Sequence, residues 1–405
     1  MTNEAKSERR KKWLMLGIST LLTLLVTEAG LRVLKKNRAF QPDPRFIRSL
    51  AANNAGVTPT WETEDNLNGR SDTIPKTPGF FKTPTNNIGF RMTEDVGEKA
   101  PDEKRVLLLG DSYTEAYQVP PEERFADLTT ARLRADPATR HWRVLNGGVE
   151  NGCPAQYILQ LRSWLTELKP DIVIVAFAPN DLMDDYTYER WYGFDFDAGG
   201  LPERVQARTE LALLKWSYIL RYFESATLTG APKVHGIFFG DEQPQVPLFY
   251  WQELACEGNA SSKQFFAAKT ARYMRGMKEM VETAGAKFGV AMVQYPYFFE
   301  HEAYYKGTAP GLAATIEKYG CYRTKGIPYQ EFVEDFFRQS GIKFRNPYWA
   351  MARAEEERPG HKLWNFYDYH YAGPGHALMA DATTAVVREL IGVPTGEPAE
   401  PKPVP

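Results

Sequence analysis

The stretch VLLLGDSYTE, from Val106 to Glu115, predicts the fold of this chain. Its first four residues are all apolar, which is typical of a parallel strand buried on both faces. The strand ends at Gly110, Asp111 and Ser112, so it places a hydroxyl at the carboxyl edge of the sheet, where open α/β folds carry out their chemistry. A serine there is a candidate nucleophile if a base lies within reach. The same residue types also serve as turn and N-cap residues, so this stretch alone leaves both interpretations open.

Three further segments place polar residues in a comparable way. They are Asn-Gly-Gly at 146–148 after the apolar run 142–145, Ala-Pro-Asn-Asp at 178–181 after the run 171–177, and Asp-Tyr-His at 368–370 followed by Gly-His at 375–376. This order of motifs resembles the SGNH or GDSL hydrolase family, which is named for its catalytic Ser, Gly, Asn and His. The resemblance covers roughly residues 80 to 392, about three quarters of the chain.

The resemblance implies a role for each motif residue. Ser112 is the implied nucleophile and His370 the implied general base that takes its proton. Asp368 is implied to hold the His370 imidazole in the correct tautomer and to stabilise its cation. The implied oxyanion hole combines the backbone N–H groups of Ser112 and Gly148 with the side-chain amide of Asn180. Gly147 is the alternative, but the N-x-G spacing from Asn146 selects Gly148, and a glycine is expected because the backbone approaches the oxyanion closely. Asp368 lies two residues before the histidine, whereas many relatives place the acid three residues before it.

His376 is the rival base among the six histidines of the chain. Only His370 has a carboxylate two residues earlier and a glycine-containing turn into a helix after it. We therefore interpret His376 as a structural residue at the start of that helix. Asp181 is expected to brace the loop that carries Asn180. Ala178 stands where relatives have glycine, which leaves the amide donor in place.

Apolar strands alternate with helical segments from residue 106 onward, which predicts parallel βαβ units with right-handed crossovers. The expected strands cover 106–109, 142–145, 172–177, 289–294 and 342–345, and the expected helices cover 125–136, 156–169 and 263–284. The predicted fold class is therefore α/β. We expect a doubly wound, flavodoxin-like parallel sheet of about five strands, of the SGNH hydrolase type by resemblance.

The hydrolase domain is expected over residues 96–392. Within it, residues 184–261 form an aromatic-rich insertion that would overhang the cleft, and its rings suit either a substrate groove or the insertion's own core. Residues 35–95 are interpreted as an extended juxtamembrane segment, in which Asn87–Arg91 is expected to pack against the domain. The Pro-rich residues 393–405 are expected to be disordered.

The N-terminus has the pattern of a membrane anchor. Residues 1–12 are strongly basic, and residues 13–34 are mostly apolar and long enough to span a bilayer, which takes about 20 residues. No small-residue cleavage pattern follows, so an uncleaved signal anchor is favoured over a cleaved signal peptide. The positive-inside rule then keeps residues 1–12 in the cytoplasm. It predicts a single-pass membrane protein with an extracytoplasmic catalytic domain.

The composition fits one sizeable domain with additions: 405 residues, 43% hydrophobic, 25% charged. The net charge of −2 gives no sign of a nucleic-acid partner. No metal-ligand set, phosphate-binding loop or dinucleotide fingerprint occurs, so we expect neither a metal nor a cofactor. Of the three cysteines, Cys256 and Cys321 are candidates for a disulfide in an exported domain, and Cys153 is interpreted as a small buried hydrophobe.

The sequence leads to three hypotheses about function. The first is a serine esterase that removes O-acyl groups, chiefly O-acetyl, from an extracytoplasmic polysaccharide or glycolipid through an acyl-enzyme. The second is an O-acetyltransferase on the same material, with a hydroxyl in place of water as the acceptor. The third is a non-catalytic carbohydrate-binding or assembly protein, which is disfavoured because all the catalytic residue types are present. A lipase activity stays open. The expected partners are acylated carbohydrate, the membrane and envelope polysaccharide machinery.

Overall fold

The computed structural model describes residues 3–34, 86–116, 118–149, 152–182, 184–185, 194–205, 269–299, 326–357, 363–364 and 370–395. Most of the expected insertion, the end of the Pro-rich tail, Asp368, Cys256 and Cys321 lie outside these residues. The described residues fall in two units. One is helix α1 (Asn3–Leu34), and the other is an α/β domain.

The α/β domain is built on five parallel strands in the order β2-β1-β3-β6-β7. They are β1 (Lys104–Leu109), β2 (Trp142–Asn146), β3 (Ile172–Phe177), β6 (Lys287–Met292) and β7 (Lys343–Arg345). Numbered along the chain, these strands have the flavodoxin-like order 2-1-3-4-5. Every residue of β3 is buried, because helices cover both faces of the sheet. The predicted fold class is confirmed.

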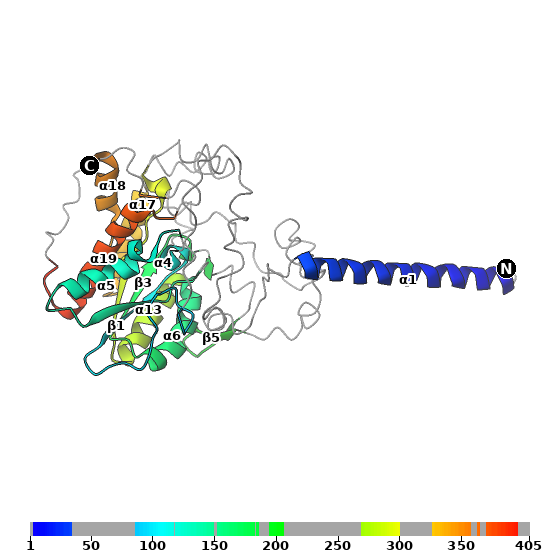
Figure 1. Ribbon diagram of the computed structural model, residues 1–405, viewed down its shortest axis with the longest axis horizontal. Helices are drawn as coiled ribbons and strands as arrows, with labels where there is room; N and C mark the ends of the chain where they lie inside the picture. Colours follow the sequence, from blue (N-terminus) through cyan, green and yellow to red (C-terminus); the bar gives the residue numbers. More distant parts are fainter. Residues whose placement is uncertain are drawn as a thin grey trace. The chain divides into compact units, whose positions relative to one another are not determined.

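Two pairs of helices cover the sheet (Figure 1). Helix α5 (Phe125–Ala135) packs against β2, and α19 (Gly373–Ile391) packs against β6, β7 and α5. Helix α6 (Pro154–Leu168) packs against α13 (Thr270–Thr283), which lies on β6. Since right-handed crossovers put α5 and α6 on opposite faces, each pair covers one face of the sheet.

The remaining elements are α4 (Ser112–Glu115), η2 (Pro121–Glu123), the antiparallel strands β4 (Phe194–Phe196) and β5 (Pro202–Val205), η4 (Pro296–Phe298), α17 (Ile327–Gln339) and α18 (Tyr348–Glu357). The sequence analysis does not predict α17, α18 or the β4–β5 pair. The strand expected at 289–294 is β6 and lies two residues earlier, because its pairing with β3 begins at Lys287. The helix expected from residue 263 is described only from Thr270.

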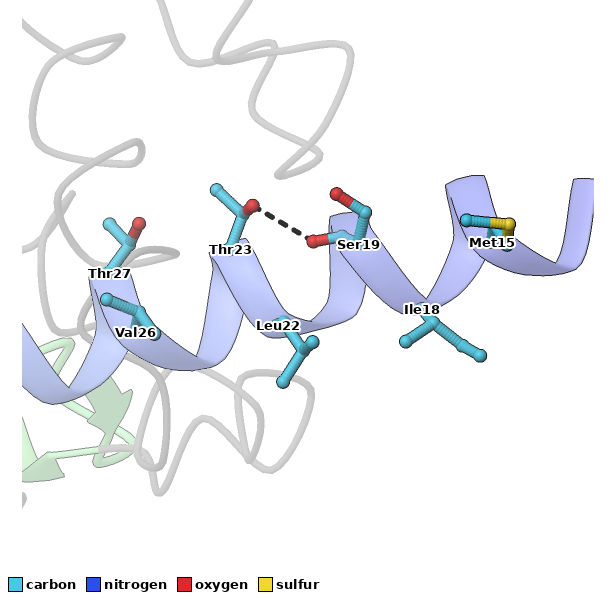
Figure 2. Close-up of a pocket in the computed structure, with 7 residues that line it drawn as sticks. All are labelled: Met15, Ile18, Ser19, Leu22, Thr23, Val26 and Thr27. Atoms are coloured by element: carbon cyan, nitrogen blue, oxygen red, sulfur yellow. Dashed lines mark hydrogen bonds between the residues drawn. The ribbon is translucent and has the colours of Figure 1, made fainter. Parts of the chain in front are cut away.

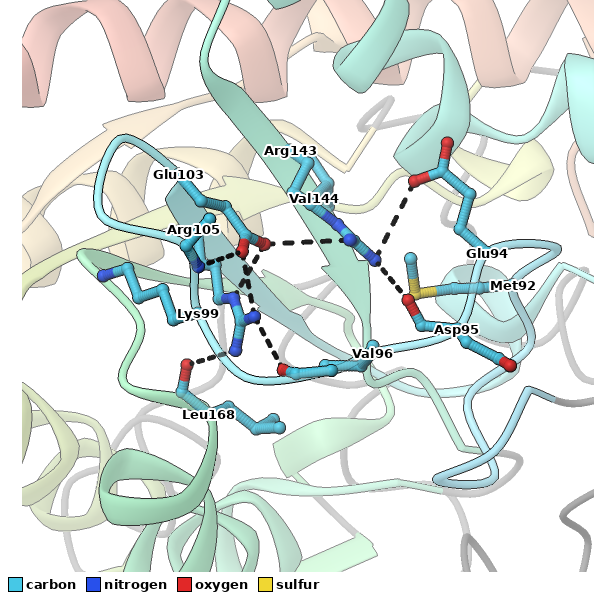
Figure 3. Close-up of polar contacts among 12 residues, drawn as sticks. Met92, Glu94, Asp95, Val96, Lys99, Glu103, Arg105, Arg143, Val144 and Leu168 are labelled. Carbon is cyan, nitrogen blue, oxygen red and sulfur yellow. Dashed lines mark hydrogen bonds and ion pairs between the residues drawn. The ribbon is translucent and has the colours of Figure 1, made fainter.

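Residues 86–100 run ahead of β1 and are joined to the domain by a polar network (Figure 3). Glu103 accepts a hydrogen bond from Arg105 Nε at 2.8 Å, and Glu103 Oε1 also lies 3.7 Å from Arg143 Nη1. Arg105 Nη2 donates to Gly97 O at 2.9 Å, and Arg143 Nη2 donates to Asp95 O at 3.3 Å. Two arginines of the first strands thus hold the backbone of the preceding segment.

The same segment also contributes to the core. Phe90 is buried and meets the ring of Trp164 on α6 edge to face, at 4.7 Å between centroids. The buried Arg91 pairs with Glu115 of α4 at 3.0 Å, and Arg124 Nη1 donates to Arg91 O at 2.9 Å. Residues ahead of the first strand therefore contact the turn that carries Ser112.

Helix α1 is long and apolar enough to cross a membrane over Lys11–Gly30, where the mean hydropathy is 1.5. Figure 2 shows its apolar side chains with Ser19 and Thr23 between them, and Thr23 Oγ1 donates to Ser19 O at 2.9 Å within the helix. Such a bond satisfies the threonine hydroxyl without an outside partner. The helix begins at Asn3 rather than at residue 13, because the basic residues extend it toward the N-terminus.

Candidate active site

Ser112 lies in a tight turn at the carboxyl end of strand β1, which lies between β2 and β3. Asp111 is the N-cap of α4, and its carboxylate accepts the Tyr113 backbone N–H at 2.9 Å. Helix α4 is a single turn, because Ala116 adopts a left-handed conformation (φ 55°) and ends it. Ser112 is the first residue of this helix. A one-turn helix gives little dipole, however, so the stabilisation expected from a helix N-terminus is small.

The structure brings His370 to Ser112. The Nε2 atom of His370 lies 2.7 Å from Ser112 Oγ, although the two residues are far apart in the chain. His370 precedes α19, and its ring lies against that of Tyr113 at 4.6 Å between centroids. Ser112 and His370 are both half-buried. Asp368 lies outside the described residues, so its role stays a prediction.

His376 is placed away from Ser112, inside the domain. It is fully buried in the first turn of α19, where its Nδ1 accepts the Phe125 backbone N–H at 3.4 Å and its ring stacks on that of Phe125 at 5.8 Å. Burial lowers the pKa of His376 to about 3, so the ring is neutral at physiological pH. These contacts fit the structural role that the sequence analysis gives to His376.

Gly148 follows β2 and packs on the turn that carries Ser112. Its backbone N–H donates to Asn146 Oδ1 at 3.1 Å, while Asn146 Nδ2 donates to Thr114 O at 2.9 Å. A Cβ at Gly148 would lie only 2.5 Å from Glu115 N. Glycine is therefore required by contact with the α4 backbone. The sequence analysis attributed this glycine to a close approach to the oxyanion, which is a different reason.

Asn180 lies in the loop after β3 and is held by several polar groups. Its Nδ2 donates to Asp184 Oδ2 at 2.7 Å, and its Oδ1 accepts the hydroxyl of Tyr295. Asp181 is buried and accepts the Ala178 N–H at 2.8 Å and the Tyr157 hydroxyl at 3.2 Å. Asp181 thus braces the loop, as the sequence predicts.

Ser112, Gly148, Asn180 and His370 meet at the carboxyl edge of a flavodoxin-like sheet, each half-buried. This is the arrangement that the motif order implies. The strand order is the flavodoxin-like one that the sequence predicts.

The chain was also compared with known proteins. No family model matches the sequence, and no curated protein matches it. Matching solved structures include a protein of the G-D-S-L lipolytic family from Desulfitobacterium hafniense, at 12% identity and a TM-score of 0.35 over 70% of this chain and 99% of that one. An acetylxylan esterase from Geobacillus stearothermophilus matches at 14% identity and a TM-score of 0.34, over 72% of this chain and 95% of its own.

Buried carboxyl groups lie next to Ser112 and Asn180. Burial raises the pKa of Asp111 to about 6, although the Tyr113 N–H, the nearby His370 ring and the Asn180 amide act in the opposite direction. Burial also raises the pKa of Asp184 to about 8 and that of Asp185 to about 6. Asp185 joins two helices, because it accepts the Ala155 N–H at 2.7 Å and the Thr270 hydroxyl at 2.7 Å.

Cys153 is fully buried, and burial raises the pKa of its thiol. It is a free cysteine, in agreement with its interpretation as a small hydrophobe. Among the described residues, no group of three or more His, Cys, Asp or Glu side chains could hold a metal ion.

The sequence analysis missed two residues that contact Asn180. Asp184 is one helical turn beyond Asn180, and Tyr295 follows β6, the neighbour of β3. The contact of Asp184 with Asn180 has one sequence signal, their spacing of four residues. The contact of Tyr295 with Asn180 follows only from the order of the strands in the sheet.

Proposed function

We propose that this chain is an SGNH-type serine esterase that forms an acyl-enzyme on Ser112. The observation that carries the proposal is the 2.7 Å distance between Ser112 Oγ and His370 Nε2, within the reach that proton transfer needs. The half-buried position of both side chains leaves the pair accessible to a substrate.

In the proposed reaction, Ser112 Oγ attacks the carbonyl carbon of an ester while its proton passes to His370 Nε2. The tetrahedral intermediate then collapses, and the leaving alcohol takes the proton from Nε2. Water attacks the acyl-enzyme with Nε2 as the base, and the carboxylic acid leaves with Ser112 restored. Asp368 is proposed to orient the other ring nitrogen of His370.

The backbone N–H groups of Ser112 and Gly148 and the amide of Asn180 are the proposed donors to the oxyanion. The Gly148 N–H bonds to Asn146 Oδ1, so the oxyanion has to replace that acceptor. A donor that strengthens its bond as charge develops contributes about 10²–10³ to kcat.

We propose O-acetyl groups on an extracytoplasmic polysaccharide or glycolipid as the substrate. Helix α1 supports this location, because one span with basic residues on its N-terminal side would hold the domain outside the cytoplasm. Transfer to a sugar hydroxyl in place of water would use the same residues and is separated from hydrolysis by the identity of the product.

The test is p-nitrophenyl acetate turnover and fluorophosphonate labelling of the full-length chain in detergent. Ser112→Ala and His370→Ala should each abolish turnover, and Ser112→Ala should also abolish labelling. His376→Ala should lower stability while the folded fraction keeps its turnover, because the contacts of the buried His376 are with Phe125 and Tyr371. Turnover that survives Ser112→Ala would overturn the proposal. Loss of turnover in a folded His376→Ala variant would move the base assignment to His376.

A further inference from the structure

Tyr295 and Asn180 are brought together by the register of two neighbouring strands. Phe177 at the end of β3 pairs with Met292 at the end of β6. Asn180 and Tyr295 each lie three residues beyond these partners, so both emerge at the same edge of the sheet. The pairing extends one residue further, because Val293 N donates to Phe177 O at 2.8 Å.

The two ends of the Asn180 amide have different partners. The Tyr295 hydroxyl donates to Oδ1, and Nδ2 donates to Asp184 Oδ2 at 2.7 Å. In the flipped orientation the Tyr295 hydroxyl would face the amide nitrogen and would no longer donate to the amide oxygen. Asn180 follows β3, the neighbour of β1, so its amide lies at the same edge of the sheet as Ser112.

Tyr295 is itself fixed relative to the nucleophile. Only 9% of it is exposed, and its ring stacks on that of Tyr113 at 5.1 Å and an interplanar angle of 17°. Tyr113 follows Ser112 directly and also contacts the His370 ring. The hydroxyl of Tyr295 is therefore held at a set place with respect to both catalytic groups.

We propose that Tyr295 is a positioning residue, whose hydroxyl holds the Asn180 amide with its N–H end toward the oxyanion formed at Ser112. The proposal deepens the proposed function and rests on it. Tyr295 acts through Asn180, and its effect belongs to the transition state, when the negative charge has developed.

The kinetic test is Tyr295→Phe in the full-length chain with p-nitrophenyl acetate, since phenylalanine keeps the stacking and removes the hydroxyl. We expect kcat to fall about tenfold while KM stays within about twofold, a part of the 10²–10³ that a whole donor contributes. In an Asn180→Ala background, Tyr295→Phe should have no further effect. The matched control is Tyr329→Phe, which removes a buried hydroxyl that has no hydrogen-bond partner among the described residues, and it should leave kcat unchanged.

Two kinetic outcomes would overturn the proposal. One is a Tyr295→Phe variant with the kcat of the wild type. The other is an equal fall of kcat with and without the Asn180 amide, which would mean that Tyr295 acts independently of Asn180.

A spectroscopic measurement decides the proposal even if the wild type shows no Ser112-dependent turnover, an outcome that would remove the proposed function alone. In protein labelled with ¹⁵N at asparagine, the side-chain amide signals of Asn180 are those lost in Asn180→Ala. Tyr295→Phe should shift these signals and speed their exchange with water, and Tyr329→Phe should not. Unchanged Asn180 signals in Tyr295→Phe would show that the hydroxyl does not hold the amide.

Discussion

At the scale of single residues, the candidate site combines the half-buried side chains of Ser112 and His370 with nearby carboxyl groups that are buried. Asp111 is the clearest case, because it is 1% exposed and yet caps the turn that carries Ser112. The cap needs an acceptor oxygen but not a charge. The domain therefore loses stability when the buried group ionises.

Asp111→Asn tests this cost, since the asparagine oxygen still accepts the Tyr113 N–H. The pKa of Asp111 is raised from 3.8 to about 6 on folding, so the folded state binds the proton more tightly than the unfolded chain. By linkage, the wild type loses stability relative to the variant as pH rises from about 4 to 6, and the difference stays constant above that range. Two pKa units correspond to about 3 kcal/mol.

Denaturant unfolding at pH 4, 5, 6 and 7 would measure the difference. Asp102→Asn is the control, because the side chain of Asp102 is 74% exposed. Parallel stability curves for the wild type and Asp111→Asn would contradict the prediction.

At the scale of elements, the turn that carries Ser112 is held in place by neighbouring segments. Gly148, at the end of β2, touches the backbone of α4 at Glu115, and Arg91 of the preceding segment pairs with the Glu115 side chain. These two contacts add to the hydrogen bond from Asn146 Nδ2 to Thr114 O and to the ring contacts of Tyr113 in positioning the short helix α4.

Gly148→Ala should displace α4, because the added methyl group would lie 2.5 Å from Glu115 N. Overpacking of this kind costs about 1–3 kcal/mol, and displacement of Ser112 should lower turnover at least tenfold. Gly97→Ala is the matched control, since a Cβ there meets nothing within 4 Å. Thermal unfolding and p-nitrophenyl acetate turnover would measure both effects. A Gly148→Ala variant as stable and active as Gly97→Ala would show that α4 tolerates the methyl group.

The sequence predicts those elements whose pattern is local. The mostly apolar runs of β1, β2 and β3 identify buried strands, and the polar motifs directly after them place Ser112, Gly148 and Asn180 at one edge. Helix α17 also has a local signal, with Tyr329, Val333 and Phe337 buried at intervals of four, which the sequence analysis overlooked. The contact of Tyr295 with Asn180 depends on which strands are neighbours, and the need for glycine at 148 depends on how closely two backbone segments approach. The pattern of a single sequence does not contain this information.

At the scale of the whole molecule, helix α1 and the α/β domain are separate units. We expect the full-length chain to remain in the membrane fraction after washing at alkaline pH, and a variant without residues 13–30 to be released. Removal of residues 396–405 is the control and should change nothing. A reporter fused after Pro405 and active only outside the cytoplasm should be active, and a silent reporter would contradict the proposed location.

The packing of residues 86–96 sets a boundary for protein engineering. A soluble form cut just before β1 would lose the contact of Phe90 with Trp164 and the ion pair of Arg91 with Glu115. Removal of one member of a buried ion pair costs about 3–5 kcal/mol, which is a large part of the free energy of unfolding of a typical domain. A secreted version that begins at or before Asn86 therefore keeps the contacts that stabilise the turn carrying Ser112. A version that begins at the first strand loses these contacts.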